Sequence, residues 1–268
     1  MKKILFITAL LVSLRSKAQE LYVFTEPASN MAAKSIGLRL NNYISDVKHS
    51  AEINYVLVPE VMLGVSKKLM VHADGFFSNR NKGLRAEGGS IYSKYRFLSK
   101  DDVQTHFRMA AFGRVSFNNS IINQQEINLY GYNSGFEAGI IATQLLHKVA
   151  LSSGLSFLKA IDNGTNKYPF GSKDSKALNY TLSAGKLMLP KDYKNYRQTN
   201  LNLMLEFLNQ YNVGSGKYYI DAAPSVQFIL NSQSRIDAGY RKQLSSTLSR
   251  TAADVFFIRL EHNFFNAY

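Results

Sequence analysis

The strongest constraint on the fold is a regular alternation of apolar and polar side chains along several long segments of the chain. In residues 106–117 the two faces separate clearly: Phe107, Met109, Ala111, Val115 and Phe117 oppose His106, Arg108, Ala110, Arg114 and Ser116. A period of two residues is the pattern of a β-strand with one apolar and one polar face. Residues 35–41, 200–208 and 255–265 repeat it, and together these segments predict an all-β protein.

The chain divides into about twelve such segments, an even number of the kind found in bacterial outer-membrane barrels. The predicted strands cover residues 34–44, 52–65, 69–79, 87–98, 103–117, 134–146, 149–160, 176–189, 199–210, 218–230, 234–244 and 253–266. Short connectors fall at 66–68, 99–102, 147–148 and 231–233, with a longer one at 190–198; long polar connectors fall at 45–51, 80–86, 118–133, 161–175, 211–217 and 245–252. This alternation predicts an antiparallel transmembrane β-barrel with short periplasmic turns and longer extracellular loops.

Composition agrees with a barrel and excludes a helical membrane protein. No apolar run approaches the roughly 18–20 residues that a membrane-spanning helix requires, whereas the predicted strands reach the roughly nine to eleven residues that cross a bilayer at a tilt. The chain has no Cys, so an exported protein of this length depends on hydrogen bonding rather than on disulfides. Its 17 Phe and 16 Tyr include several near strand ends, where a bilayer interface favours aromatic rings, although any half-buried sheet favours them too.

Three features resist the barrel interpretation. Residues 136–155 also fit a helical period of 3.6 residues. Pro59 and Pro224 lie inside predicted strands, where each removes a ladder hydrogen bond, so we expect β-bulges there. Lys186 falls on the predicted lipid-facing side unless a bulge near Gly185 reverses the register.

Residues 1–18 are typical of a cleaved secretory signal peptide. Lys2 and Lys3 precede the apolar run 4–14, and the small residue Ala18 provides a cleavage position. The signal peptide contains four basic residues and no acid, so the mature chain keeps most of the formal charge of +13. That charge suits anionic lipid headgroups or anionic solutes better than nucleic acid.

The remaining residues divide into two predicted parts. Residues 19–33 form either a periplasmic lead-in or a plug of the lumen, and residues 34–268 form the barrel as a single domain. We expect a monomer in the cell outer membrane, in contact with outer-membrane lipid and lipopolysaccharide and with no nucleic-acid partner.

Several short stretches carry a family resemblance. They are Pro59–Glu60 leading into Leu63–Leu69, Ser183–Pro190, Asn200–Glu206, Ala223–Phe228 and a final aromatic-ended strand. In this order, over roughly residues 52–268, they resemble the outer-membrane barrel family named for transporters of the meta-pathway of phenol degradation. The chain has Pro224-Ser225 where that family usually has Pro-Gly, and Tyr268 where it usually ends in Phe. The resemblance implies a barrel of about twelve strands that passes small molecules. The Ala18-Gln19 junction and the ending 256–265 are similar to those of exported barrels of Bacteroidota.

The polar faces of the strands carry charges of both signs, which a barrel would place in its lumen. A predicted basic cluster joins two neighbouring strands, with few acids between its members, and would favour anions: Lys94, Arg96, Arg108 and Arg114. The candidate counter-charges are Glu60, Asp74, Glu137, Glu206, Asp237 and Glu261. The alternative is that opposite charges pair and fill a narrow lumen, because each would otherwise be a desolvated, unpaired ion.

Catalysis, metal binding and cofactor binding are not predicted. The five His residues show no metal-ligand spacing, and the Gly-rich stretches lack the spacing of a phosphate loop. A lipid-modifying enzyme would need a Ser beside a His on the outer wall, and His262 with Ser245 or Ser246 is the conceivable pair.

The sequence favours a non-enzymatic barrel that acts as a narrow channel or transporter for small solutes, with a preference for anions. The alternative is a plugged barrel with a structural or surface-recognition role, carried by the loops at 118–133 and 161–175. An outer-membrane lipid-modifying enzyme is the third hypothesis.

Overall fold

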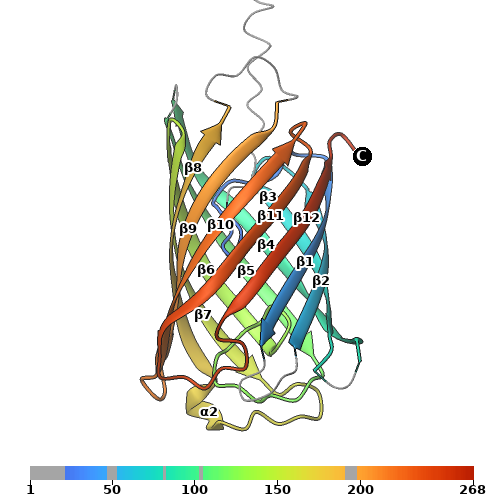
Figure 1. Cartoon of the computed structure of the whole chain (residues 1–268), viewed down its shortest axis with the longest axis vertical. Helices are drawn as coiled ribbons and strands as arrows, with labels where there is room; N and C mark the ends of the chain where they lie inside the picture. Colours follow the sequence, from blue (N-terminus) through green and yellow to red (C-terminus); the bar gives the residue numbers. More distant parts are fainter. Residues whose placement is uncertain (1–21, 47–52, 81–82, 103–104, 191–197) are drawn as a thin grey trace, which may run out of the picture.

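A computed structural model describes residues 22–46, 53–80, 83–102, 105–190 and 198–268, and these residues form a closed barrel of twelve antiparallel strands (Figure 1). The strands are β1 (Ser35–Asp46), β2 (Ile53–Gly64), β3 (Leu69–Ser78), β4 (Arg85–Asp102), β5 (Thr105–Asn118), β6 (Ser134–Leu146), β7 (Val149–Ile161), β8 (Lys176–Leu189), β9 (Asn200–Asn212), β10 (Tyr218–Leu230), β11 (Ser234–Ser246) and β12 (Val255–Phe264). A single turn of helix, α2 (Gly171–Asp174), interrupts the connection from β7 to β8. The predicted fold class is confirmed, while the predicted signal peptide lies outside the described residues.

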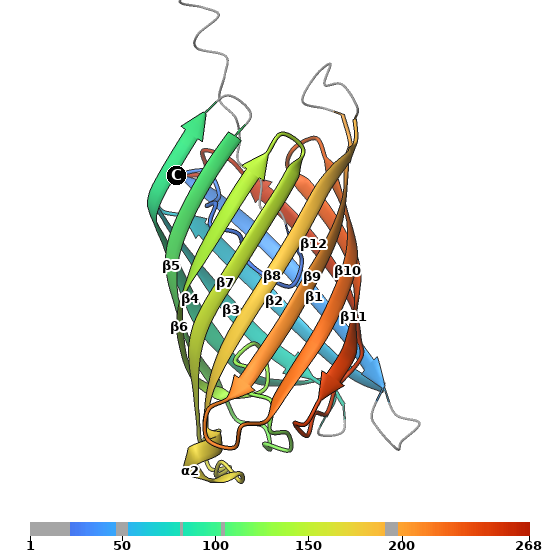
Figure 2. The ribbon, with the colours of Figure 1, turned by 90° about the vertical axis from the view of Figure 1, so that its left-hand side faces the viewer.

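The sheet closes because β1 pairs with β12 as well as with β2. In the closing pair the register runs from Ile36 opposite Phe264 to Ile44 opposite Phe256. The strands are tilted against the barrel axis, as closure of a twisted sheet requires (Figure 2). A closed barrel has no edge strand, so its ladder satisfies backbone donors and acceptors even where no water is available.

The alternation in the sequence separates the outer wall from the lumen. On β12, Phe256, Leu260 and Phe264 are exposed on the outer wall, whereas Phe257 and Glu261 are buried on the inner side. Most other strands likewise expose large apolar side chains outward and bury polar or charged ones inward. An apolar exterior around a charged interior is the arrangement of a membrane barrel, the reverse of a soluble sandwich.

The β-bulges predicted at the two strand prolines were wrong. Pro59 pairs with Leu40 of β1, and Pro224 pairs with Leu205 of β9, both without a register shift. Each proline-containing strand also pairs with a second neighbour, β3 for Pro59 and β11 for Pro224. In that ladder the pairing is interrupted for two residues and then resumes in the same register. Proline lacks an N–H donor, so a short gap in one ladder accommodates it without an extra residue.

Register shifts occur elsewhere, one of them next to Lys186. The β8–β9 ladder shifts between Leu187 and Leu189, just after Lys186. Lys186 therefore stays on the outer wall, where it is exposed opposite Val149 of β7 and Leu203 of β9. It lies near the end of the barrel with the short turns, so its ammonium group can reach the interface.

Two further expectations concern the connections. The helical alternative for residues 136–155 is wrong, because this stretch forms β6 and β7 around a turn at His147, whose φ is 53°. The short joint predicted at 99–102 is also wrong: β4 continues to Asp102, which pairs with Thr105 of β5.

The two ends of the barrel differ in their connections. The short turns and the C-terminus lie at one end, at the top of Figure 1, and the longer connections and α2 lie at the other. We call these the turn end and the loop end. No described helix has the length and apolar content needed to span a bilayer.

Candidate functional site: the barrel lumen

Residues 22–34, here called the lumenal segment, run inside the barrel before the chain enters β1 (Figures 1 and 2). Tyr22 and Val23 pack against Met204 and Phe257 of the inner wall. Further along the segment, Ala28 is fully buried in a cluster with Ala110 of β5. Side chains from β5, β9 and β12 therefore surround the segment, which occupies the part of the lumen toward the turn end.

The main attachment of the lumenal segment is Glu206 of β9, whose side chain is fully buried. Its carboxylate accepts hydrogen bonds from the backbone N–H groups of Val23, Phe24 and Thr25 at 2.9, 2.9 and 2.8 Å. Three main-chain donors thus converge on one buried anion. Charge-assisted hydrogen bonds of this kind are stronger than neutral ones.

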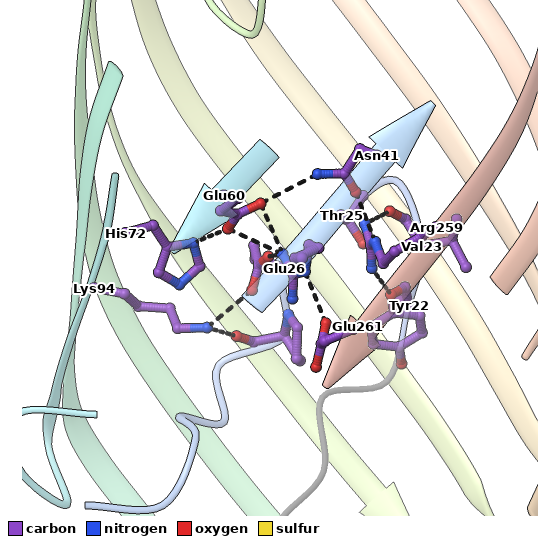
Figure 3. A network of polar contacts seen from close by, with 12 residues as sticks. Tyr22, Val23, Thr25, Glu26, Asn41, Glu60, His72, Lys94, Arg259 and Glu261 are labelled. Atoms are coloured by element: carbon purple, nitrogen blue, oxygen red, sulfur yellow. Dashed lines mark hydrogen bonds and ion pairs between the residues drawn. The ribbon is translucent and has the colours of Figure 1, made fainter. Parts of the chain in front are cut away.

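Basic residues hold the carbonyl groups of the same segment (Figure 3). Arg259 of β12 donates to the carbonyl oxygens of Tyr22, at 3.3 Å, and Val23. Lys94 of β4 donates to the carbonyl oxygen of Pro27 at 2.8 Å and pairs with the Glu26 carboxylate at 3.4 Å. The wall therefore supplies an acid to the segment's N–H groups and bases to its carbonyl groups.

Arg39 of β1 links the segment to a wider network of buried charges. Its guanidinium pairs with Glu26 at 3.1 Å, with Glu60 of β2 at 3.2 Å and with Glu261 of β12 at 2.8 Å. Glu60 also contacts the imidazole of His72 (Figure 3). Buried charges are tolerated when they are paired in this way, and removal of one partner is costly.

The four residues of the predicted basic cluster all lie on lumen-facing positions but do not form one group. Lys94 is fully buried against the lumenal segment, and Arg114 pairs with Asp74 of β3 between the rings of Tyr92 and Tyr130. Arg108 lies six residues from Arg114 on the same strand, which is about 20 Å along a strand.

The other two members lie toward the turn end. Arg108 pairs with Asp101 at 2.9 Å and donates to the Ser29 hydroxyl at 3.0 Å. Arg96 donates to the carbonyl oxygen of Lys67 in the β2–β3 turn at 2.7 Å. The expectation of few acids between the basic residues is therefore not met, because Glu26, Asp74 and Asp101 each pair with one of them.

The predicted counter-charges take three kinds of partner. Glu60, Asp237 and Glu261 form ion pairs with arginines on neighbouring strands, and Asp74 of β3 forms one with Arg114 of β5, two strands away. Glu206 binds main-chain N–H groups instead, as described above. Glu137 of β6 accepts a hydrogen bond from Ser156 at 2.6 Å and lines a cavity rather than contacting the lumenal segment.

A second element enters the lumen from the loop end. Residues 119–133, here called the inserted loop, connect β5 and β6, and Ile127 and Leu129 in it are buried. These side chains pack against Leu158 and Ala160 of β7 and Ala177 of β8. The predicted connector at 118–133 is therefore largely an internal element.

Polar contacts fix the inserted loop in place. The Gln210 side chain of β9 accepts from the Ile127 N–H at 2.8 Å and donates to the Ile127 carbonyl at 2.9 Å. Arg250, in the connection from β11 to β12, pairs with Glu126 at 2.7 Å and with Asp221 of β10 at 2.6 Å. Burial raises the pKa of Glu126, but the Arg250 and Arg241 guanidinium groups outweigh burial and hold that pKa below its ordinary value.

A cavity of about 280 Å³ separates the two inserts. Val23–Glu26 line it on one side and the inserted loop on the other, with Tyr43, Phe112 and Arg114 in its wall. At about 30 Å³ for each water, the space holds several water molecules. The lumen thus contains the lumenal segment toward the turn end, a chamber, and the inserted loop toward the loop end.

The structure gives His262 a different partner from the ones predicted. Its Nδ1 atom lies 2.8 Å from the Ser234 hydroxyl on the outer wall, and its ring packs edge-on against Phe264. Ser246 instead donates to the carbonyl oxygen of Leu248. None of the described carboxylates or amides pairs with this imidazole, so the Ser-His contact lacks the third group that a triad uses to orient the base.

The described residues contain no group of three or more His, Asp or Glu side chains arranged to hold a metal ion.

Several contacts that shape the lumen could not be predicted from the sequence. Arg39 and Arg259 lie on the polar faces of predicted strands, but no sequence pattern indicates that they bind the lumenal segment. Glu126 and Arg250 lie in predicted external loops. The one sequence feature that indicated an internal position for the inserted loop was the pair of apolar residues Ile127 and Leu129 inside a connector expected to be exposed.

Comparison with known proteins places the fold among outer-membrane barrels. No protein-family model matches the chain, and no curated protein sequence matches it. Among solved structures, an outer-membrane channel from Pseudomonas putida F1 is similar over 91% of this chain and 100% of that one, with 10% identity and a TM-score of 0.60. The NanC porin is similar over 85% of this chain and 98% of its own, with 10% identity and a TM-score of 0.51. At such identities the likeness concerns the fold.

Proposed function

We propose that the chain is an outer-membrane channel for small solutes whose resting state is closed by the lumenal segment. The observation that carries this proposal is the set of contacts between the segment and the wall. Glu206, Arg259 and Lys94 hold the segment mainly through its main-chain N–H and carbonyl groups. Such contacts are reversible, and water can replace them when the segment leaves.

The fold and the family resemblance support a channel in the outer membrane. The similar solved structures are an outer-membrane channel and a porin. The motifs that resemble the phenol-degradation transporter family and the Bacteroidota-type ending point the same way. Export by a cleaved signal peptide at residues 1–18 belongs to the proposal.

An anion preference in the open state follows from the charges around the segment. Glu26 would leave the lumen together with the segment, while Lys94, Arg108 and Arg259 would each lose a segment contact. Glu206 would lose its three N–H donors and stay in the lumen, but it contributes one negative charge against the three basic residues. Release therefore shifts the turn end of the lumen toward positive potential, which favours anions.

Single-channel recording tests the proposal. The mature chain would be refolded, inserted into a planar bilayer and recorded under a KCl gradient, as wild type, as Glu206→Gln and as Glu137→Gln. We expect rare openings in the wild type, frequent anion-selective openings in Glu206→Gln, and wild-type behaviour in Glu137→Gln, because Glu137 lines the lumen without touching the segment. A silent bilayer for all three folded, inserted proteins would contradict a channel.

A plugged barrel with a structural or recognition role is the second candidate. The observation that favours it is the inserted loop, which is fixed by the buried ion pairs of Arg250 and by the side chain of Gln210. If displacement of the lumenal segment leaves the loop end impassable, the recordings above stay silent. The connection at 162–175 would then be the first surface to test for a partner.

A further inference from the structure

Two lysines face each other on the outer wall near the loop end of the barrel. Lys159 of β7 is directly opposite Lys176 of β8 in the strand register. Their neighbours Leu158, Ala160 and Ala177 are buried against the inserted loop, so the alternation of a strand directs both lysines outward.

This arrangement is unfavourable for the protein alone. Side chains directly opposite on antiparallel strands have Cβ atoms about 4.5–5.5 Å apart, and like charges in such a pair repel each other. No ion pair joins either lysine to an acid among the described residues. Asp162, the acid closest in sequence to Lys159, is instead held by Lys167 at 2.9 Å and by the N–H of Tyr168 at 2.9 Å.

The surroundings of the pair are apolar. Residues paired across adjacent strands form a row on the outer wall. In the row of the two lysines, Phe136 of β6 is opposite Lys159. In the next row toward the turn end, Phe157 is opposite Leu178. The rings of Phe136 and Phe157 lie 6.4 Å apart, and Tyr211 of β9 continues that row beyond Leu178. Two cations thus border a surface suited to acyl chains, at the end of the barrel with the long connections.

We infer that Lys159 and Lys176 bind the phosphate group of a phosphorylated lipid of the outer leaflet, with its acyl chains on Phe136, Phe157 and Leu178. A phosphate between the two ammonium groups turns their repulsion into two charge-assisted contacts. Their flexible stems let both Nζ atoms converge on one group. The apolar rows distinguish a lipid from free phosphate as the occupant. The inference rests on the proposed outer-membrane location but not on channel activity.

Lipid binding in detergent tests this site separately from conductance. Native mass spectrometry would compare diphosphoryl lipid A with its dephosphorylated form on the refolded mature chain. At about 1 kcal/mol for each basic residue near an anionic lipid surface, the Lys159→Gln/Lys176→Gln variant should bind diphosphoryl lipid A about thirtyfold more weakly than the wild type. Dephosphorylation should weaken binding to the wild type and leave binding to the variant nearly unchanged.

Lys186→Gln provides the matched control. Lys186 lies on β8 and on the outer wall, as Lys176 does, but near the turn end and without an opposing lysine. We expect this variant to bind lipid A like the wild type. The inference is overturned if the double variant keeps wild-type affinity, if Lys186→Gln loses as much, or if inorganic phosphate competes at the same concentration as the lipid.

A thermal measurement covers the case in which the double variant binds poorly because it is damaged. In detergent without phosphorylated lipid, Lys176→Gln should melt at the same temperature as the wild type or higher, because a repulsive pair is gone. Diphosphoryl lipid A should raise the melting temperature of the wild type more than that of Lys176→Gln. Equal shifts in the two proteins would overturn the inference.

Discussion

The lumenal segment and the inserted loop occupy the same lumen from opposite ends, but they are held by different interactions. The segment is bound mainly through its backbone, by Glu206 on its N–H groups and by Arg259 and Lys94 on its carbonyl groups. The inserted loop has main-chain contacts too, from the Gln210 side chain to Ile127, but it is also held by its own side chains: Ile127 lies in an apolar cluster and Glu126 forms an ion pair with Arg250.

This difference separates a releasable element from a fixed one. The loop is joined at both ends to adjacent strands, β5 and β6, and its removal would expose apolar side chains and leave buried charges unpaired. The segment also buries Tyr22 and Val23 and pairs Glu26 with wall cations, but it is joined only to β1 within the described part of the chain, and its main-chain groups can exchange wall contacts for water. We therefore expect solutes to pass by release of the segment, while the loop sets the width at the other end.

The largest expected effect is that of Arg250→Ala. The substitution leaves the carboxylates of Glu126 and Asp221 buried without their main partner, which costs about 3–5 kcal/mol of unfolding free energy. Urea-induced unfolding in detergent micelles measures it. Lys242→Ala is the control, because the Lys242–Asp254 pair is half-exposed and screened by solvent, so its loss should change the unfolding free energy little. Equal losses in the two variants would show that the inserted loop is not fixed by this ion pair.

An intermediate effect is expected for release of the lumenal segment in Glu206→Gln. The neutral amide weakens the hydrogen bonds to Val23, Phe24 and Thr25, and a hydrogen bond to a charged group contributes about 1.5–3 kcal/mol. The thiol introduced by Ser29→Cys should then react with a polar maleimide at least about tenfold faster than in the Glu206 background. Glu137→Gln should leave the labelling rate unchanged, and an unchanged rate in Glu206→Gln would mean that Glu206 does not hold the segment.

The smallest effect is expected for Ile127→Val in the inserted loop. Ile127 is 2% exposed, and loss of one buried methylene costs about 0.5–1.5 kcal/mol of unfolding free energy. If the two inserts are independent, this substitution should not change the labelling rate of Ser29→Cys. Its stability effect should also add to that of Glu206→Gln within about 0.5 kcal/mol. A larger coupling would show that the two inserts move together.

The strands were predictable because their pattern is local. Each side chain on β5 faces the lumen or the lipid according to whether its position is even or odd, and His106–Phe117 shows this directly in the sequence. The prolines show the limit of such reasoning. Pro59 and Pro224 were expected to force bulges, but whether a missing donor needs an extra residue depends on the neighbouring strand, where a two-residue gap accommodates it.

The partners of the lumen charges were not predictable, because they are far apart in sequence. Lys94 and Arg114 were grouped as neighbours on adjacent strands, yet Lys94 binds the lumenal segment and Arg114 binds Asp74. Likewise Glu126 of the inserted loop meets Arg250, a residue in a connection more than a hundred positions away. Such pairings depend on where the segment and the loop enter the lumen.

The sequence by itself determined the alternating strands, the antiparallel order set by short and long connections, and the inward direction of the charges. Only the tertiary structure decided that residues 22–34 and 119–133 occupy the lumen and which charges pair there. The physical reason is the distance along the sequence between the residues that interact. A period of two residues follows from the backbone geometry of each strand, whereas buried ion pairs and main-chain contacts form between elements that only barrel closure brings together.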